Sequence, residues 1–276
     1  MHRRAFLSTL AAATTAGAVP PVKVGHREAS MKLVGNLRVF ETASKIPGLA
    51  GVELQIVSGA HNLWSKDTLR KYKREANRWG MQIPSLAGPF GRGVQLMKPG
   101  AEEQLRKAVA AAEFLGAGVI LVPSFRDNCP DPATPEQSEP VLAMFRKVGA
   151  AAAEAGVTLG WENSRSPADN ARMIDAIGHP NVRVYYDLDN GEFYGHKGQI
   201  EDGVKLLGRD RICQVHVKNE DRLIEDRGRI DWRKAFRELK AAGYDGWYVL
   251  ESRHGDEAQL IESTSRNIEF IKRQAG

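Results

Sequence analysis

The chain has 276 residues, 42% of them hydrophobic and 26% charged, which is ordinary for a globular protein and suits either one large α/β barrel or two common domains. The formal net charge of +5 falls to +3 without Arg3 and Arg4, which lie in a segment that we expect to be removed. This small, dispersed excess of positive charge argues against nucleic acid and anionic membranes as partners.

The amino terminus has the pattern of an export signal. The pair Arg3 and Arg4 precedes a short apolar run over residues 10–19, which carries an Ala-x-Ala cleavage pattern and is too short to span a bilayer. Paired arginines followed by x-Phe-Leu resemble a twin-arginine signal. We therefore expect residues 1–18 to be a signal peptide, residues 19–276 to form the mature domain, and the protein to be exported to the periplasm. An amphipathic organelle-targeting peptide is the alternative.

The rest of the chain alternates between short apolar runs and amphipathic segments, which predict strands and helices respectively. Helix ends are marked by breakers such as Pro47-Gly48, Gly80 and Gly116. In chain order we expect a strand at 22–25, a helix at 37–46, a strand at 51–57, a helix at 66–79, a strand at 81–86, a helix at 101–115, a strand at 119–122, a long loop at 123–135, a helix at 136–155, a strand at 157–162, a helix at 167–177, a strand at 182–187, a partly helical connection at 188–205, a strand at 212–217, a helix at 232–242, a strand at 247–251 and a helix at 257–273.

Eight predicted strands that alternate with helices indicate a single-domain α/β fold, the (β/α)8 TIM barrel. The alternative is an open, doubly wound sheet. Such a sheet favours a glycine-rich nucleotide turn after its first strand, and Gly25-His26-Arg27-Glu28 does not match G-x-G-x-x-G. The barrel is therefore the preferred prediction.

The last four predicted strands each end in a side chain that can bind a metal. Glu162, Asp187, His216 and Glu251 stand at or next to the ends of apolar runs. In a parallel barrel all carboxyl-terminal strand ends open onto one face, where active sites lie. Three carboxylates brought together there would repel each other unless a cation neutralised them. We predict a metal site formed by these four residues; buried salt bridges to neighbouring basic residues are the alternative.

Three carboxylates and one imidazole form a hard, oxygen-rich donor set. Such a set suits Mn²⁺, which we expect first, or Mg²⁺, with Co²⁺ and Zn²⁺ as alternatives. One divalent ion there would polarise a substrate carbonyl and stabilise an enediolate after the adjacent carbon loses its proton. Glu162 and Glu251 lie across the metal from each other, so that one can remove the proton and the other return it to the opposite face.

Several motifs resemble those of the xylose-isomerase-like superfamily of sugar phosphate isomerases and epimerases, over essentially the whole mature chain. The last three motifs are the most specific. The motifs are Gly-Val-Glu-Leu at 51–54, Leu-Gly-Trp-Glu-Asn at 159–163, Tyr-Tyr-Asp-Leu-Asp-Asn at 185–190, Gln-Val-His-Val-Lys at 214–218, Gly-Arg-Ile-Asp-Trp at 228–232 and Gly-Tyr-Asp-Gly-Trp-Tyr-Val-Leu-Glu at 243–251.

The ketose 3-epimerases of that superfamily have matching Glu, Asp, His and Glu ligands for a divalent metal, usually manganese, and their two Glu exchange the proton. The resemblance implies the same roles here, and a substrate contact by Arg222, which stands six residues after the ligand histidine. Asn190 stands where those epimerases have a histidine, and we assign it as a substrate contact at that position. We also expect Lys218, His26 and Arg253 to contact substrate. Glu53 is assigned either to the site or to an ion pair inside the barrel.

We therefore expect an isomerase or epimerase that acts on a small carbohydrate by proton abstraction next to a carbonyl. One alternative is a lyase or hydratase that acts on 3-keto-glycosides through the same enolate chemistry. The other is a non-catalytic sugar-binding barrel. The sequence leaves open whether the chain forms a homo-oligomer.

Overall fold

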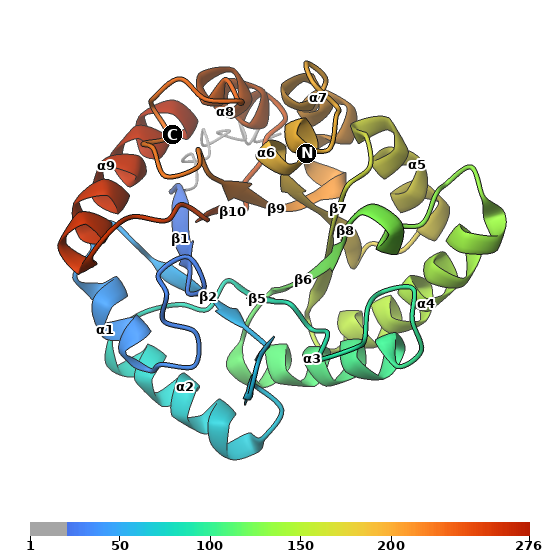
Figure 1. The fold of residues 1–276 in the computed structure, drawn as a ribbon, viewed down its shortest axis with the longest axis horizontal. Coiled ribbons are helices and arrows are strands. Elements are labelled where there is room, and N and C mark those ends of the chain that lie inside the picture. Colours follow the sequence, from blue (N-terminus) through green and yellow to red (C-terminus); the bar gives the residue numbers. More distant parts are fainter. Residues whose placement is uncertain (1–20) are drawn as a thin grey trace, which may run out of the picture.

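The computed structural model describes residues 21–276. The predicted signal peptide, residues 1–18, lies outside this range. Within it, eight parallel strands close into a barrel in the order β1-β10-β9-β8-β7-β6-β5-β2. Figure 1 shows the strands as a central ring with the helices arranged around it. The predicted single-domain (β/α)8 barrel is confirmed.

The barrel strands and the helices follow one another in regular alternation along the chain. The barrel strands are β1 (Lys23–Arg27), β2 (Gly51–Gln55), β5 (Ser85–Ala87), β6 (Val119–Ser124), β7 (Thr158–Asn163), β8 (Val182–Asp187), β9 (Ile212–Val217) and β10 (Trp247–Leu250). The helices are α1 (Arg38–Ser44), α2 (Lys66–Arg78), α3 (Ala101–Leu115), α4 (Pro135–Glu154), α5 (Pro167–Ile177), α6 (Leu188–Phe193), α7 (Ile200–Arg211), α8 (Trp232–Ala241) and α9 (Glu257–Ala275).

Four barrel strands differ from the sequence prediction by two residues or more. β1 and β6 each continue two residues further than predicted, to Arg27 and Ser124. The second barrel strand ends at Gln55, and the chain continues into a short antiparallel hairpin formed by β3 (Val57–Ser58) and β4 (His61–Asn62). The third barrel strand is only Ser85–Ala87, although the amide of Val52 still donates to the carbonyl of Gln82. Pro84 has no amide hydrogen and interrupts the ladder between these points.

Alternation along β7 shows how the fold aims its acidic side chain. Trp161 points outward, where its ring lies 4.9 Å from that of Phe145 on α4 and is completely buried. Successive side chains of a strand point to opposite faces, so Gly160 and Glu162 point into the barrel. The apolar layer between strands and helices thus fixes the direction of the polar side chains at the strand ends.

Two helices carry strong start signals in their sequences. Asp231 caps α8 by accepting from the amide of Lys234. Asp256 and Gln259 form a reciprocal capping box at the start of α9. In residues 21–276, none of the helices has the length and apolar character needed to cross a membrane.

Candidate metal and active site

The four predicted ligand side chains converge at the carboxyl-terminal mouth of the barrel. Nδ1 of His216 lies 3.1 Å from an oxygen of Glu162, and 3.6 Å from oxygens of both Asp187 and Glu251. One potential ligand atom from each of Glu162, Asp187 and His216 lies within 4.8 Å of the others. The side chain of His216 is completely buried, and that of Glu251 is only 18% exposed. The arrangement brings three carboxylates around one imidazole nitrogen.

Strand register explains this convergence. Asp187, the last residue of β8, pairs directly with His216 on β9. The amide of Glu251 donates to the carbonyl of Val217, so the chain continues the ladder between β10 and β9 one residue beyond the strand. Asp187 also caps the short helix α6, because its side chain accepts from the amide of Asn190. Neighbouring parallel strands in this register therefore place their terminal side chains at one level.

Two basic side chains balance the excess negative charge. Nζ of Lys218 donates to Asp187 at 2.7 Å and to Glu251 at 2.8 Å. The guanidinium of Arg27, at the end of β1, donates to the other oxygen of Glu251. The salt bridges that the sequence left as an alternative are therefore present in part, between Lys218 and two of the predicted ligands.

The carboxyl groups around His216 differ in acidity. Burial, together with the nearby carboxylates, raises the pKa of Glu162 to about 6, although His216 opposes the shift. Burial would also raise the pKa of Glu251, but His216, Arg27 and Lys218 lower it below its ordinary value. The pKa of Asp187 is likewise held well below its usual range against the effect of burial, by Lys218 and His216. Without a cation, Glu162 is therefore the carboxyl that most readily holds a proton.

A second layer of polar side chains lies below the imidazole, inside the barrel. Oε1 of Glu53 on β2 is 3.1 Å from Nε2 of His216. Its other oxygen accepts hydrogen bonds from Ser85 and Tyr185. Burial would raise the pKa of Glu53, but His216, Arg27 and Tyr185 lower it to about 2. Glu53 is therefore an ionised carboxylate below the site. It contacts His216 and also pairs with Arg27 inside the barrel, so its position has features of both assignments, a site residue and an internal ion pair.

Three of the five predicted substrate contacts lie at the mouth. Asn190 donates to Glu162 at 3.3 Å and accepts from Lys218 at 3.0 Å. Lys218 and Arg253 line a pocket of about 220 Å³, together with Glu251 and Asp189. Lys218 also contacts Asp187 and Glu251, so this pocket lies next to two of the predicted ligands.

His26 and Arg222 are not brought to the site, which corrects their sequence assignment. His26 is completely buried, and its Nδ1 faces the carbonyl of Arg27. Because side chains alternate along β1, Arg27 points into the barrel and His26 points away from it. Arg222 lies on the loop after β9, where it is 52% exposed and pairs with Glu220.

Some residues near the site were given no role in the sequence analysis. Tyr185, Ser85 and Gln214 lie inside the barrel. Tyr185 and Gln214 begin two of the motifs quoted above and stand two residues before a predicted ligand, so period-two alternation could have indicated that they point inward. Phe125 and Tyr194 stack at the rim with ring centroids 5.5 Å apart. Burial raises the pKa of the Tyr194 phenol, and the charges of nearby site residues also act on it. Of these two rings, only Tyr194 lies within residues 188–205, where the aromatic residues of the connection could have indicated a role at the rim.

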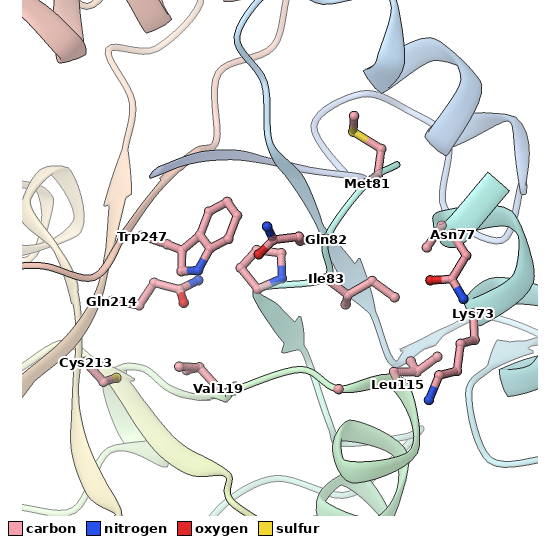
Figure 2. A pocket seen from close by; sticks show the side chains of 14 residues that line it. Lys73, Asn77, Met81, Gln82, Ile83, Leu115, Val119, Cys213, Gln214 and Trp247 are labelled. Atoms are coloured by element: carbon pink, nitrogen blue, oxygen red, sulfur yellow. The ribbon is translucent and has the colours of Figure 1, made fainter. Parts of the chain in front are cut away.

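A separate pocket of about 320 Å³ lies at the opposite, amino-terminal mouth of the barrel. Figure 2 shows Val119 and Trp247, the first residues of β6 and β10, around this pocket, together with Gln214 of β9. None of the four predicted ligands lines it. Active sites of this fold lie at the carboxyl-terminal mouth, so the candidate site is the one around His216.

The donor set at the carboxyl-terminal mouth fits a divalent cation. Oxygen ligands from three carboxylates, with one imidazole, match hard or borderline ions such as Mn²⁺, Mg²⁺, Co²⁺ and Zn²⁺. Lys218 and Arg27 offset the same negative charge that a cation would neutralise. The residues present are therefore suited to hold such an ion.

Three known proteins that are similar to this chain in sequence or fold are all sugar epimerases. L-ribulose-5-phosphate 3-epimerase UlaE of Escherichia coli O1:K1 is 24% identical over 205 residues, which cover 68% of this chain and 70% of that protein. The fold is similar to that of 3-keto-D-glucoside 4-epimerase YcjR from E. coli, with a TM-score of 0.73 and 18% identity over 91% of this chain and 99% of that one.

D-allulose 3-epimerase from Methylomonas sp. has a similar fold, with a TM-score of 0.74 and 18% identity over 92% of this chain and 98% of the other. The family model described as xylose isomerase-like TIM barrel matches residues 40–274. This match confirms the resemblance that the motifs indicated. The chain belongs to the xylose isomerase-like TIM barrel family.

Proposed function

We propose that this protein is a divalent-metal-dependent sugar isomerase or epimerase. The single observation that carries the proposal is the convergence of Glu162, Asp187 and Glu251 on Nδ1 of His216 at the mouth of the barrel. The relative UlaE of Escherichia coli O1:K1 is an L-ribulose-5-phosphate 3-epimerase, which supports the same class of reaction here. We expect Mn²⁺ to be the preferred ion.

The four side chains would hold the ion, and the ion would polarise the substrate carbonyl and stabilise the charge that develops when the neighbouring carbon loses its proton. The two glutamates are the proposed acid and base. Glu162 stands on β7 and Glu251 directly follows β10, and Nδ1 of His216 faces both carboxylates. Their pKa values are shifted in opposite directions, which is the pattern expected of a pair that gives and takes a proton.

Other residues position these groups and the substrate. Asn190 orients Glu162 through its hydrogen bond, and Arg27 with Lys218 keeps Glu251 ionised. The ammonium of Lys218 also lies next to the rim pocket, where it can donate to a substrate oxygen. Burial of the ligand side chains limits the access of water to the reacting carbon.

The test is proton exchange in D₂O. The metal-loaded protein is incubated with a panel of ketoses and with a 3-keto-glucoside, and deuterium at the carbons next to the carbonyl is followed by NMR. We expect exchange that chelation abolishes, and a loss of about 10²- to 10⁴-fold in each of Glu162→Gln and Glu251→Gln. Asp175→Asn is the matched control, because this carboxylate forms an ion pair with Arg211 on the outer surface of the barrel.

The outcomes separate the alternatives. Exchange without cleavage of the glycoside supports isomerisation or epimerisation, whereas release of the aglycone supports the 3-keto-glycoside lyase. Binding of a sugar without any exchange would support the non-catalytic barrel. Full turnover in both glutamine variants would refute the two-carboxylate mechanism.

A further inference from the structure

A chain of buried hydrogen bonds runs down the inside of the barrel below His216. Nε2 of Gln214 donates to the hydroxyl oxygen of Ser85 at 2.6 Å and to that of Tyr185 at 2.9 Å. Both hydroxyls donate to Oε2 of Glu53, at 2.7 and 2.6 Å. Oε1 of Glu53 lies 3.1 Å from Nε2 of His216. All five side chains are at most 1% exposed.

The direction of every hydrogen bond in this chain is determined by chemistry. The amide nitrogen of Gln214 is only a donor, so Ser85 and Tyr185 accept there. Each hydroxyl has a single hydrogen, and in the described residues its acceptor is the carboxylate of Glu53. Oε2 of Glu53 accepts from both hydroxyls, and Nε of Arg27 lies 3.6 Å from its Oε1, so these neighbours hold the group as a carboxylate, which only accepts. The hydrogen between Glu53 and His216 must therefore belong to Nε2 of the imidazole.

A neutral imidazole with its hydrogen on Nε2 has its lone pair on Nδ1. Nδ1 is the atom that faces Glu162, Asp187 and Glu251. We propose that Glu53 is a positioning residue, which fixes the tautomer of His216 so that Nδ1 is the atom that binds the cation. The inference rests on the proposed metal site and adds a residue that makes no contact with the ion itself.

The far end of the chain lies at the amino-terminal mouth. Figure 2 shows the side chain of Gln214 among the residues that line the pocket there. Its Oε1 has no hydrogen-bond partner within residues 21–276, so the amide is held by its two donor bonds alone. By donating to both hydroxyls, Gln214 directs their hydrogens towards Glu53, although it lies at the opposite end of the barrel from the site.

An isosteric amide in place of Glu53 cannot serve both ends of the chain. In Glu53→Gln, an amide nitrogen turned towards His216 would require Nε2 to accept and would move the hydrogen to Nδ1. An amide nitrogen turned the other way would face the hydroxyls of Ser85 and Tyr185, which already accept from Nε2 of Gln214, and with Gln214 in this orientation their hydrogens would have no acceptor. The first orientation favours the tautomer with its hydrogen on Nδ1, which cannot bind the cation there. The second removes the hydrogen bonds from Ser85 and Tyr185 that hold the side chain of residue 53 below His216.

The experiment is calorimetric titration of metal-free protein with Mn²⁺ and with Zn²⁺. Partners that orient a metal-binding histidine typically change affinity by about 10- to 100-fold, and we expect Glu53→Gln to weaken binding by that factor. Glu28→Gln is the matched control, because Glu28 is also completely buried but its carboxyl accepts from the amide of Gln55 and makes no contact with His216. We expect its affinity to equal that of the unaltered protein.

A second measurement needs no variant and holds even if Glu53→Gln fails to fold. In ¹⁵N-histidine NMR of the Zn²⁺-loaded protein, we expect the hydrogen of His216 on Nε2 and the metal on Nδ1. The reverse assignment, or equal affinities of the unaltered protein and Glu53→Gln, would overturn the inference alone. Absence of saturable binding to the unaltered protein would overturn the proposed function with it.

Discussion

Replacing Lys218 by methionine should destabilise the metal-free protein far more than the metal-loaded one. Nζ of Lys218 donates to Asp187 at 2.7 Å, to Glu251 at 2.8 Å and to Asn190 at 3.0 Å. Its side chain is 16% exposed, and that of Asp187 is 1% exposed. Methionine is unbranched and flexible like lysine and only one heavy atom shorter, so the change removes the ammonium group with its charge and three donors and keeps most of the apolar stem.

The size of the effect follows from this burial. Removing one partner of a buried ion pair costs about 3–5 kcal/mol. Lys218 and Glu251 keep some contact with water, so we expect a loss of about 3 kcal/mol in the free energy of unfolding. A bound cation would neutralise the same carboxylates, and we expect the loss to shrink to about 1 kcal/mol. By linkage, this difference of about 2 kcal/mol makes the variant bind the ion about 30-fold more tightly.

The assay is urea unfolding at neutral pH, with EDTA or with saturating Mn²⁺, combined with calorimetry for the affinity. Lys45→Met is the matched control, because Lys45 also faces two carboxylates, Glu41 and Glu257, but on the surface. Exposed pairs contribute little, and its stability should hardly change. An equal loss of unfolding free energy in Lys218→Met with and without metal would show that the ammonium and the cation do not neutralise the same carboxylates.

Three further predictions concern the imidazole, the barrel interior and export. Burial alone would lower the pKa of His216, but the surrounding carboxylates hold it well above its usual value. A metal ion must therefore displace a proton from the imidazole, and below that pKa we expect the metal affinity to rise by about tenfold per pH unit. Calorimetric titrations in two buffers with different ionisation enthalpies should detect one released proton, and identical heats in the two buffers would contradict this. A Cβ at Gly160 would lie 2.9 Å from Sγ of Cys213 and 3.1 Å from two side-chain atoms of Tyr185. We therefore expect Gly160→Ala to cost about 1–3 kcal/mol in urea unfolding, and unchanged stability would mean that both side chains have room to move. Arg3→Lys with Arg4→Lys should leave precursor inside the cell, as measured by fractionation and immunoblot, and unaltered export would reject the twin-arginine route.

The convergence of the four side chains was predictable because two simple rules combine at the strand ends. A parallel barrel gathers its carboxyl-terminal ends at one mouth, and an acid or imidazole after an apolar run has few other reasons to be there. Glu162, Asp187, His216 and Glu251 accordingly lie together. The strand bounds of β8 and β9 also agree with the sequence prediction, since both are apolar runs that start and stop sharply.

The residues that the sequence misplaced depend on information that a single chain does not display. His26 and Arg27 are adjacent, and which one points inward depends on the register of β1 against β2 and β10. Arg222 was assigned from its distance along the chain to His216, but its direction is set by local partners on its own loop, Glu220 and the carbonyl of Arg227.

The layer below the site was hidden for a different reason. Glu53 and His216 are 163 residues apart in sequence, and nothing local to either one indicates the other. Their contact results from closure of the whole barrel. Sequence alone could therefore name Glu53 as inward-facing or structural, but not as the neighbour of one particular histidine.

The ladder between the first and last strands has a consequence for biosynthesis. β1 pairs with β10, and the bond between Arg27 and Glu251 joins residues 224 positions apart. A nascent polypeptide still attached to the ribosome lacks this seam until its final segments have emerged, and contacts between such distant residues form slowly. An incomplete translation product without β10 therefore also lacks Glu251, and the proposed metal site can form only after this last barrel strand has been synthesised.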